Sequence, residues 1–240
     1  MALAKPSADR QEPEQGRISG PEATRKALID AALELFGTNG FEATSTREIA
    51  RRAGANIASI AYHFGGKGGL RQACADAVRS LIGEMVGSAF ARSNPVVTAS
   101  AEPETAAHVL EAIMRHVVRT ALLSPQAVRF VPFVLREING NSPVLDSLYR
   151  ELMEPTHRRL CALWGAATGA EPESAAVRLA VFAMVGQMIY FRIGSQIVTR
   201  RMGWQGYSSA EVEQIADTVC TNLRAALQAG RTNHTGKERR

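Results

Sequence analysis

Aromatic residues are scarce in this chain, since Phe, Trp and Tyr together make up 6% of its 240 residues. Cysteine is also rare: Cys74, Cys161 and Cys220 lie far apart and form no CxxC or Cys/His metal-ligand spacing. These absences exclude a disulfide scaffold and a zinc site of the usual spacing. We expect no metal, no cofactor and three inert thiols at apolar helical positions.

Catalytic motifs are absent as well. No GxSxG elbow, HExxH or GxxxxGK[ST] loop occurs, and the five histidines share no metal spacing. The glycine run around Lys67 follows a helical pattern instead of a strand, which argues against a nucleotide loop. The sequence therefore predicts that the protein is not an enzyme.

Long uninterrupted apolar segments are missing too. Charged residues from Lys5 to Glu14 interrupt the N-terminus, so no signal segment is expected there. The most apolar stretch, 175–198, is too short and too polar for a membrane span, because Arg178, Gln187 and Arg192 fall within it. We expect a cytoplasmic protein with no membrane association.

Alanine is abundant, and hydrophobic residues make up 45% of the chain. With no persistent strand alternation, this composition favours an all-α fold of close-packed helices. The predicted organisation is a disordered arm at 1–18, a three-helix DNA-binding domain at 19–70, a regulatory and dimerisation domain at 92–229 and a disordered tail at 230–240. A linking helix is expected at 67–91, and further helices at 108–123, 126–138, 142–168 (kinked at Pro155), 172–202 and from 208 onward.

The stretch 44–70 predicts two short helices joined by a tight turn. Ser45 and Glu48 form a capping box for the first of them, and Gly54 supplies the left-handed residue that ends it. Asn56 is suited to cap the second helix, whose Ile60 can turn into the core. This pattern is typical of a helix-turn-helix, which places its second helix in the major groove of DNA.

The segment 24–70 resembles the DNA-binding domain of the TetR family of bacterial regulators. The matching residues are Ile29, Ala31, Ala32, Leu35, Phe36, Gly40, Phe41, Thr44, Thr46, Ile49, Ala50, Ala53, Gly54, Ile60, Phe64, Lys67 and Leu70. Two positions depart from the family pattern: Ala61 stands where an aromatic residue is usual, and Gly66-Lys67-Gly68 stands where a Ser-Lys-Glu-like start is usual. Tyr62 is therefore expected to supply the aromatic contact alone.

The motif positions predict the residues that contact DNA. Arg47 suits a guanine and Ile57 or Ala58 a thymine methyl. Thr46, His63 and Lys67 suit phosphates, and at Lys67 the free amides of a helix start add to the charge. Between residues 17 and 80 there are nine basic and six acidic residues, a surplus that fits phosphate contact and equally a solvated basic face. Packing of the turn by Tyr62 and His63 is the structural alternative. The predicted contact set is Thr46, Arg47, Asn56, Ile57, Ala58, Ser59, Tyr62, His63 and Lys67.

Two C-terminal segments are expected to form a homodimer interface. The stretch 175–198 is apolar nearly all round, and the last helix carries the stripe Val212, Ile215, Ala216, Val219, Leu223, Ala226 and Leu227. The resemblance implies the same, because this family dimerises through its last two long helices. The residues 190–193 and 200–204 are similar to those of the CecR-like subgroup.

Polar residues within apolar helices of the regulatory domain suggest a pocket for a small, mostly hydrophobic effector. An ion pair within the core, with Arg136 bound to Glu137 or to another acid, is the alternative. The predicted lining, from three helices around one cavity, is Met114, His116, Phe133, Arg136, Glu137, Met184, Gln187 and Tyr190.

The sequence thus predicts a ligand-responsive transcriptional regulator, and the resemblance makes a repressor the expected form. Its partners are double-stranded operator DNA, a small-molecule effector and a second copy of the chain. A helical adaptor that keeps the fold without specific DNA binding is the alternative.

Overall fold

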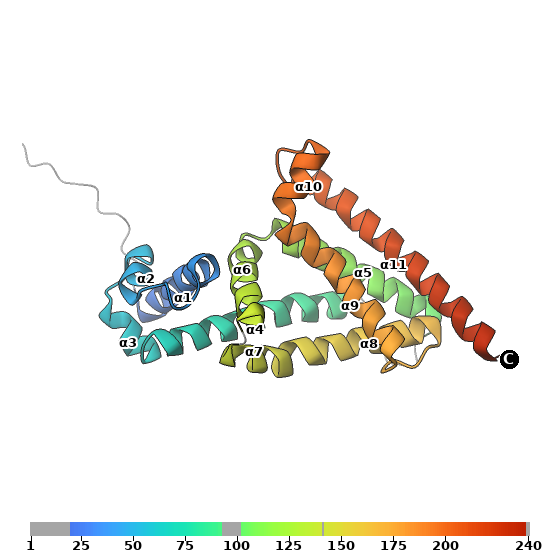
Figure 1. Ribbon diagram of the computed structural model, residues 1–240, viewed down its shortest axis with the longest axis horizontal. Helices are drawn as coiled ribbons and strands as arrows, with labels where there is room; N and C mark the ends of the chain where they lie inside the picture. Colours follow the sequence, from blue (N-terminus) through green and yellow to red (C-terminus); the bar gives the residue numbers. More distant parts are fainter. Residues whose placement is uncertain (1–19, 93–101, 141, 239–240) are drawn as a thin grey trace, which may run out of the picture.

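The structure, a computed structural model, describes residues 20–92, 102–140 and 142–238, and these are helical with no strand among them (Figure 1). The all-α prediction is therefore confirmed. The predicted arm and residues 93–101, at the start of the predicted regulatory domain, lie outside the described residues. The helices are α1 (Pro21–Asn39), α2 (Thr46–Arg52), α3 (Ala58–Phe64), α4 (Lys67–Arg92), α5 (Pro103–Leu123), α6 (Pro125–Asn139), α7 (Pro143–Leu148), the π-helix η1 (Tyr149–Met153), α8 (Glu154–Thr168), α9 (Ala175–Ile193), α10 (Ser195–Met202) and α11 (Ser209–Glu238).

Local capping sets the ends of α2 and α3 as the sequence predicts. The hydroxyl of Ser45 accepts a hydrogen bond from the Glu48 amide at 3.1 Å, and Asn56 Oδ1 accepts one from the Ala58 amide at 2.9 Å. Gly54 adopts φ +63° between the two helices. Gly66 departs from the family pattern at a position with φ +126°, which side chains other than hydrogen rarely tolerate.

The apolar core of the N-terminal helices extends into the rest of the molecule. Leu28, Phe36, Ile49 and Ile60 are buried there, and Phe133 of α6 packs into the same cluster. The helices α1 and α6 approach closely, because a Cβ on Gly37 would lie 3.0 Å from the Phe133 nitrogen. The N-terminal domain is therefore fastened to α6 as well as to the long α4.

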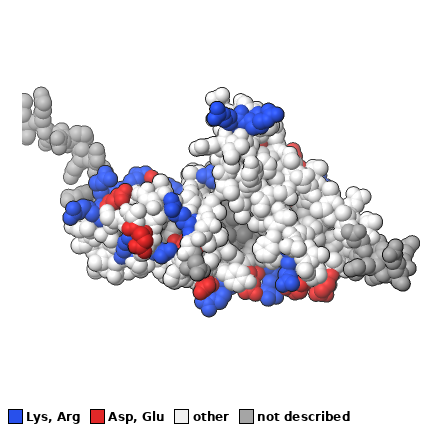
Figure 2. Space-filling view, in the orientation of Figure 1, with Lys and Arg blue, Asp and Glu red and all other residues white. Residues whose placement is uncertain are grey.

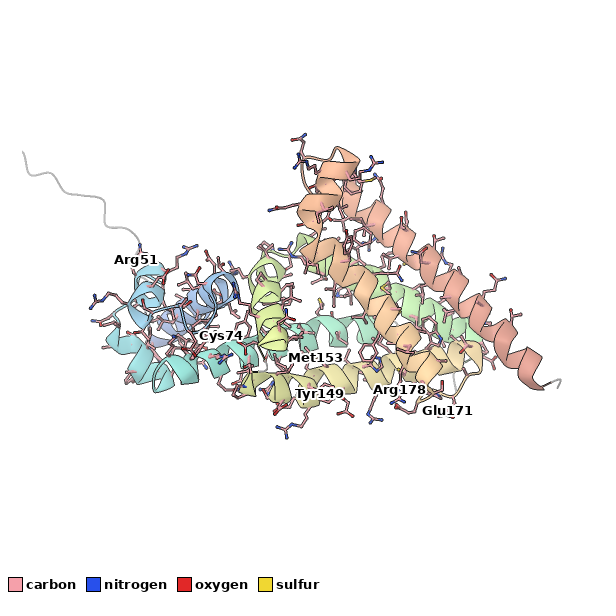
Figure 3. The ribbon with its side chains drawn as sticks, in the orientation of Figure 1. Arg51, Cys74, Tyr149, Met153, Glu171 and Arg178 are labelled. Carbon is pink, nitrogen blue, oxygen red and sulfur yellow. The ribbon has the colours of Figure 1, made fainter. Side chains whose placement is uncertain are left out.

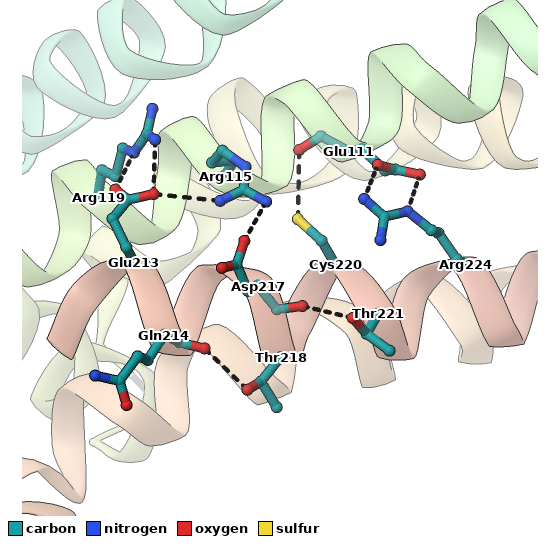
Figure 4. Close-up of polar contacts among 10 residues, drawn as sticks. All are labelled: Glu111, Arg115, Arg119, Glu213, Gln214, Asp217, Thr218, Cys220, Thr221 and Arg224. Carbon is teal, nitrogen blue, oxygen red and sulfur yellow. Dashed lines mark hydrogen bonds and ion pairs between the residues drawn. The ribbon is translucent and has the colours of Figure 1, made fainter. Parts of the chain in front are cut away.

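A second core joins α5, α8, α9 and α11. In Figure 1, α4 extends from the N-terminal helices toward this core, and α9 and α11 diverge from α10 at the apex. Ion pairs on the solvent side hold α11 along α5, such as Arg115 to Asp217 at 2.7 Å and Arg224 to Glu111 at 2.7 Å (Figure 4). The packing of α11 on α5 is thus apolar inside and ionic at its edge.

The region around Pro155 differs from the predicted kink. The chain forms α7 and then the π-helical turn η1 before α8 begins at Glu154. Proline lacks an amide and crowds the preceding turn, so the disturbance precedes Pro155, which sits in the first turn of α8. The predicted helix at 142–168 is therefore present without a break from Pro143 to Thr168, and its distortion is the π-helical turn η1 instead of a kink at Pro155 itself.

Three other helix boundaries also require correction. The predicted helix at 172–202 is divided at Gly194, where an ideal Cβ would lie 2.9 Å from the Tyr190 carbonyl oxygen and 3.2 Å from the Tyr190 ring, so the position is crowded. The helix predicted to begin at 108 begins at Pro103, which occupies a favourable first-turn position. The tail predicted from 230 is helical to Glu238, and Arg231 ties its start to the Ala167 carbonyl at 2.7 Å.

The apolar stripe of α11 faces its own chain, which corrects its predicted role at a dimer interface. Leu223 is only 2% exposed and lies in the second core with Val212, Ile215 and Val219. The helix α9 presents the opposite case. In the described part of the chain it is the one helix long and apolar enough to cross a membrane by length and composition, and much of its apolar surface is uncovered.

Candidate nucleic-acid interface

The helices α2 and α3 lie at one end of the molecule, next to the start of α4 (Figure 1). Lys and Arg side chains are prominent on this end in Figure 2, whereas the face formed by the middle of the molecule is largely uncharged. A short helix with one buried face and one free face is what a groove-reading element requires.

The helix α3 divides its residues between core and solvent. Ile60 is buried, Phe64 is half-buried against the N-terminal core, and Ile57 and Ala58 are exposed. Tyr62 is 82% exposed, with its ring edge-on to His63 at a centroid separation of 4.9 Å. Tyr62 therefore does not pack into the core, which argues against the structural alternative for this residue.

The helix α2 contributes a basic face. Arg47 is exposed and Thr46 is half-buried at the first turn. Arg51 follows Arg47 by one helical turn, is also exposed, and projects from the N-terminal domain in Figure 3. Arg52 is engaged by Glu34 at 2.8 Å. Arg51 was missed in the sequence analysis, although its i, i+4 spacing from Arg47 was a usable signal.

The start of α4 carries a second basic group. Lys67 Nζ lies 4.4 Å from the Phe41 ring centroid and donates to the Glu42 carbonyl at 3.4 Å. Arg71 lies over the same ring, also at 4.4 Å. Cation–π contacts of this kind hold a flexible side chain near one position. Lys67 is thus held beside the exposed turn that joins α3 to α4.

Two of the residues predicted to contact DNA, Asn56 and Ser59, form hydrogen bonds within the chain in the absence of DNA. Asn56 uses its Oδ1 to cap α3, which leaves its side-chain amide as a donor. Ser59 is half-buried, and its amide bonds to the Asn56 carbonyl at 3.0 Å. The structure brings all nine predicted residues onto α2, α3 and the adjoining helix starts.

The eight residues predicted to line one effector cavity are divided between two cores. Met114 and Met184 are buried in the second core, whereas Phe133 is buried in the N-terminal core. Periodicity indicates an inward face but not which core the face enters. The prediction of a single cavity lined by all eight does not fit this division.

The polar members of that set have specific partners. Arg136 donates to the carbonyls of Gly37 and Thr38, and Glu137 binds Arg71 instead of Arg136. Gln187 accepts from Asn222 at 3.0 Å, and Tyr190 is exposed on α9. The nitrogen of His116 lies 3.2 Å from the Ser88 hydroxyl. Arg136 and Glu137 therefore connect domains, as structural residues.

The three cysteines are buried and free. Burial raises the pKa of the Cys74, Cys161 and Cys220 thiols above their ordinary value, so the reactive thiolate is disfavoured. Among the described residues, no group of three or more His, Cys, Asp or Glu side chains could hold a metal ion.

Comparison with known proteins gives two family matches. Residues 28–74 match the family described as bacterial regulatory proteins, tetR family, and residues 106–230 match the C-terminal domain of the HTH-type transcriptional dual regulator CecR. The chain is 34% identical to CecR of Shigella flexneri over 213 residues, which cover 88% of this chain and 94% of that protein.

Solved structures show the same fold at low identity. A TetR-like transcriptional regulator from Rhodococcus sp. RHA1 is 17% identical, with a TM-score of 0.58 over 88% of this chain and 99% of that one. AibR in complex with isovaleryl coenzyme A and operator DNA is 18% identical, with a TM-score of 0.57 over 82% of this chain and 96% of that one.

Proposed function

Because this chain belongs to the TetR family of bacterial transcriptional regulators and carries a C-terminal domain of the CecR type, we propose that it is a ligand-responsive repressor. It binds a palindromic operator as a homodimer and leaves the operator when a small-molecule effector binds. The family is a non-enzymatic class of DNA-binding regulators, and we assign the protein to the cytoplasm, where its DNA is found.

The observation that carries this proposal is the exposed face of α3. A tyrosine that is 82% exposed, on a two-turn helix whose Ile60 is buried, leaves an aromatic ring free to enter the major groove. Ile57 and Ala58 offer apolar contacts to thymine methyl groups, and Arg47 offers a bidentate contact to guanine. Ser59 on α3 and the side-chain amide of Asn56, two residues before α3, are additional donors.

Phosphate contacts surround these base-reading residues. Thr46 and Lys67 are the first residues of α2 and α4, His63 lies in the last turn of α3, and Arg51 extends the basic face of α2 (Figure 3). Such contacts set the position and orientation of a domain on the duplex without reading the base sequence. They also make affinity fall with salt concentration.

The homodimer interface of the proposal is the exposed apolar face of α9. Leu179 and Ile193 are exposed and lie seven residues on either side of Gly186, and Phe182 and Tyr190 lie four residues on either side of it. A twofold axis at Gly186 pairs residue 179 with residue 193 and residue 182 with residue 190, so each exposed apolar side chain meets another across the interface. A glycine at the centre permits close approach of the two backbones.

Control by a small molecule is supported by the AibR structure, which was solved with both isovaleryl coenzyme A and operator DNA. An effector that binds one dimer conformation more tightly than the other shifts the population between them. In the operator-bound conformation, the two recognition helices are spaced by about 34–36 Å, one turn of DNA.

The adaptor alternative keeps the fold and lacks sequence preference. The two functions are separated by the binding of the full-length protein to the DNA upstream of its own gene and to shuffled DNA of the same length. An adaptor shows no preference once added salt has suppressed the phosphate contacts. A repressor retains a preference of about 10³-fold or more at physiological salt.

Substitution of Tyr62 and Lys67 tests the assigned roles on operator DNA identified in that way. Tyr62→Ala is expected to weaken operator binding at least tenfold while leaving binding to shuffled DNA unchanged. Lys67→Ala is expected to weaken both and to lower the slope of log K against log salt by about one per site. Fluorescence anisotropy titrations at several salt concentrations measure both quantities.

Control measurements separate contact from folding. Both variants should keep the helicity and dimerisation of the wild type, because Tyr62 is exposed and Lys67 is half-buried at the surface. Wild-type operator affinity in both variants would contradict the assignment of α3 and the start of α4 as the DNA-contacting surface.

A further inference from the structure

A cavity of about 560 Å³ lies between α1, α4 and α6, where the N-terminal domain meets the regulatory domain. Its volume falls within the range of about 300–1,000 Å³ that is typical of small-molecule sites. The position is distinct from the cavity that the sequence analysis predicted inside the regulatory domain. It also borders α1 directly, one helix away from the DNA-reading helix.

The floor of the cavity is apolar. Ile29 and Leu33 of α1, Val78 and Leu81 of α4, and Phe130 of α6 contribute to it. Ala23 of α1 and Ala77 of α4 leave room at the sides. This lining suits an elongated or branched hydrocarbon of modest size.

The rim is charged, with more cations than anions. Arg25, Lys26 and Arg129 oppose Glu22 and Asp30, and Lys26 is neutralised by Asp30 at 2.8 Å. Within the described part of the chain, no hydrogen bond or ion pair engages the half-buried Arg129. Gln126 accepts from the Ser124 hydroxyl, so its side-chain amide remains as a neutral donor. A cation without a partner above an apolar floor favours an amphipathic anion.

Arg25 connects this rim to the recognition helix. Its guanidinium lies 5.4 Å from the ring centroid of Phe64, the last residue of α3. At the opposite end of the α1–α6 contact, Arg136 holds the Gly37 carbonyl at 2.8 Å. Arg136 therefore keeps the C-terminal ends of α1 and α6 together while a molecule bound between their first turns pushes those turns apart. Such a movement of α1 also displaces Arg25 from Phe64 of α3.

We propose that this cavity binds a small amphipathic carboxylate, with the carboxylate at Arg129 and the hydrocarbon on Ile29, Leu33 and Phe130. The bound molecule shifts α1 relative to α6 and so lowers affinity for operator DNA. The inference rests on the proposed function only for this second step, because binding itself requires no DNA.

Decanoate and decanol are matched probes for the site, since they share a chain and differ in charge. Isothermal titration calorimetry on the full-length dimer is expected to give one decanoate per protomer, with decanol bound at least tenfold more weakly. Arg129→Gln should reduce decanoate affinity about tenfold and leave decanol binding unchanged. Ala77→Phe should abolish binding of both probes, because the new ring fills the cavity.

Arg150→Gln is the matched control, because it removes the same charge from an exposed arginine of η1 away from the cavity. It should bind both probes as the wild type does. The site is refuted if decanoate does not bind the folded dimer, or if it binds Arg129→Gln and Ala77→Phe with wild-type affinity.

The regulatory step is measured separately on operator DNA. Saturating decanoate should weaken operator binding by wild-type protein about tenfold or more and should not affect Ala77→Phe. If decanoate binds without any change in operator affinity, the regulatory step is overturned and the proposal of a binding site stands. Loss of operator affinity in Arg129→Gln with unaltered decanoate binding assigns Arg129 to DNA phosphate and overturns the site. A protein that binds decanoate but no specific DNA would contradict the proposed function instead.

Discussion

Replacement of Leu179 by glutamate is expected to convert the dimer into folded monomers and to weaken operator binding at least 100-fold. Leu179 is 67% exposed in the single chain, so a charge there does not disturb its own core. In the dimer, each protomer then contributes one carboxylate to the apolar interface, and neither carboxylate has a partner of opposite charge. Burying these unpaired charges is unfavourable. A monomer presents one recognition helix and loses the second half-site. Sedimentation velocity and anisotropy titrations measure the two effects.

The position of the twofold axis allows a sharper version of this test. If the axis passes Gly186, residue 179 of one chain faces residue 193 of the other, and Ile193 is 53% exposed. Leu179→Glu combined with Ile193→Lys in the same chain should then place opposite charges against each other and restore much of the dimer. A double variant that stays monomeric would show that these two positions do not meet.

Two further substitutions serve as controls. Val128→Glu places the same charge at an exposed apolar residue of α6 outside the α9 face and should leave the dimer intact. Leu223→Glu should unfold the chain, because Leu223 is 2% exposed within its own core. A folded monomer from Leu223→Glu would mean that α11, and not α9, carries the interface.

Local rules predicted the DNA-reading end of the molecule well. The caps at Ser45 and Asn56 and the left-handed Gly54 depend on residues within three positions of each other, so the sequence contains the whole interaction. The capping box at Ser208 follows the same logic, since its amide donates to the Glu211 carboxylate at 2.9 Å. The all-α fold and the family resemblance rest on these short-range patterns.

Long-range packing could not be predicted in the same way. An apolar stripe shows that a helix face is buried, but Leu223 is covered by its own chain and Leu179 is not. Phe133 and Met114 were assigned to one cavity because both face inward, yet they enter different cores. The cavity between α1, α4 and α6 joins segments about fifty residues apart and leaves no local pattern.

The Arg71–Glu137 ion pair connects α4 to α6 and is largely buried, and breaking it is expected to cost about 3–5 kcal/mol of unfolding free energy. Arg71 Nε and Nη2 donate to the two carboxylate oxygens at 3.0 and 2.9 Å. The Glu137 side chain is 3% exposed, whereas that of Arg71 is 20% exposed. Arg71→Leu therefore leaves a buried carboxylate without its ion-pair partner. It should lower the free energy of unfolding, measured with urea, by more than Glu137→Leu does.

A double-mutant cycle separates the pair from its surroundings. Glu137→Leu should cost less than Arg71→Leu, because Arg71 can turn toward solvent and keep its contact with Phe41. Arg71→Leu combined with Glu137→Leu should recover most of the loss, since no unpaired charge remains. Equal and additive losses in the two single variants would contradict a coupled buried pair.

Arg79→Leu provides the comparison on the same helix. Arg79 pairs with Asp76 and Glu151, but all three side chains are more than a third exposed, so its loss should cost less than about 1 kcal/mol. Only the Arg71 variants should also reduce operator affinity, because Arg71 and Lys67 both lie 4.4 Å from the centroid of the Phe41 ring, and Lys67 is the proposed phosphate contact. The same contact thus stabilises the junction between α4 and α6 and orients the edge of the DNA-reading surface.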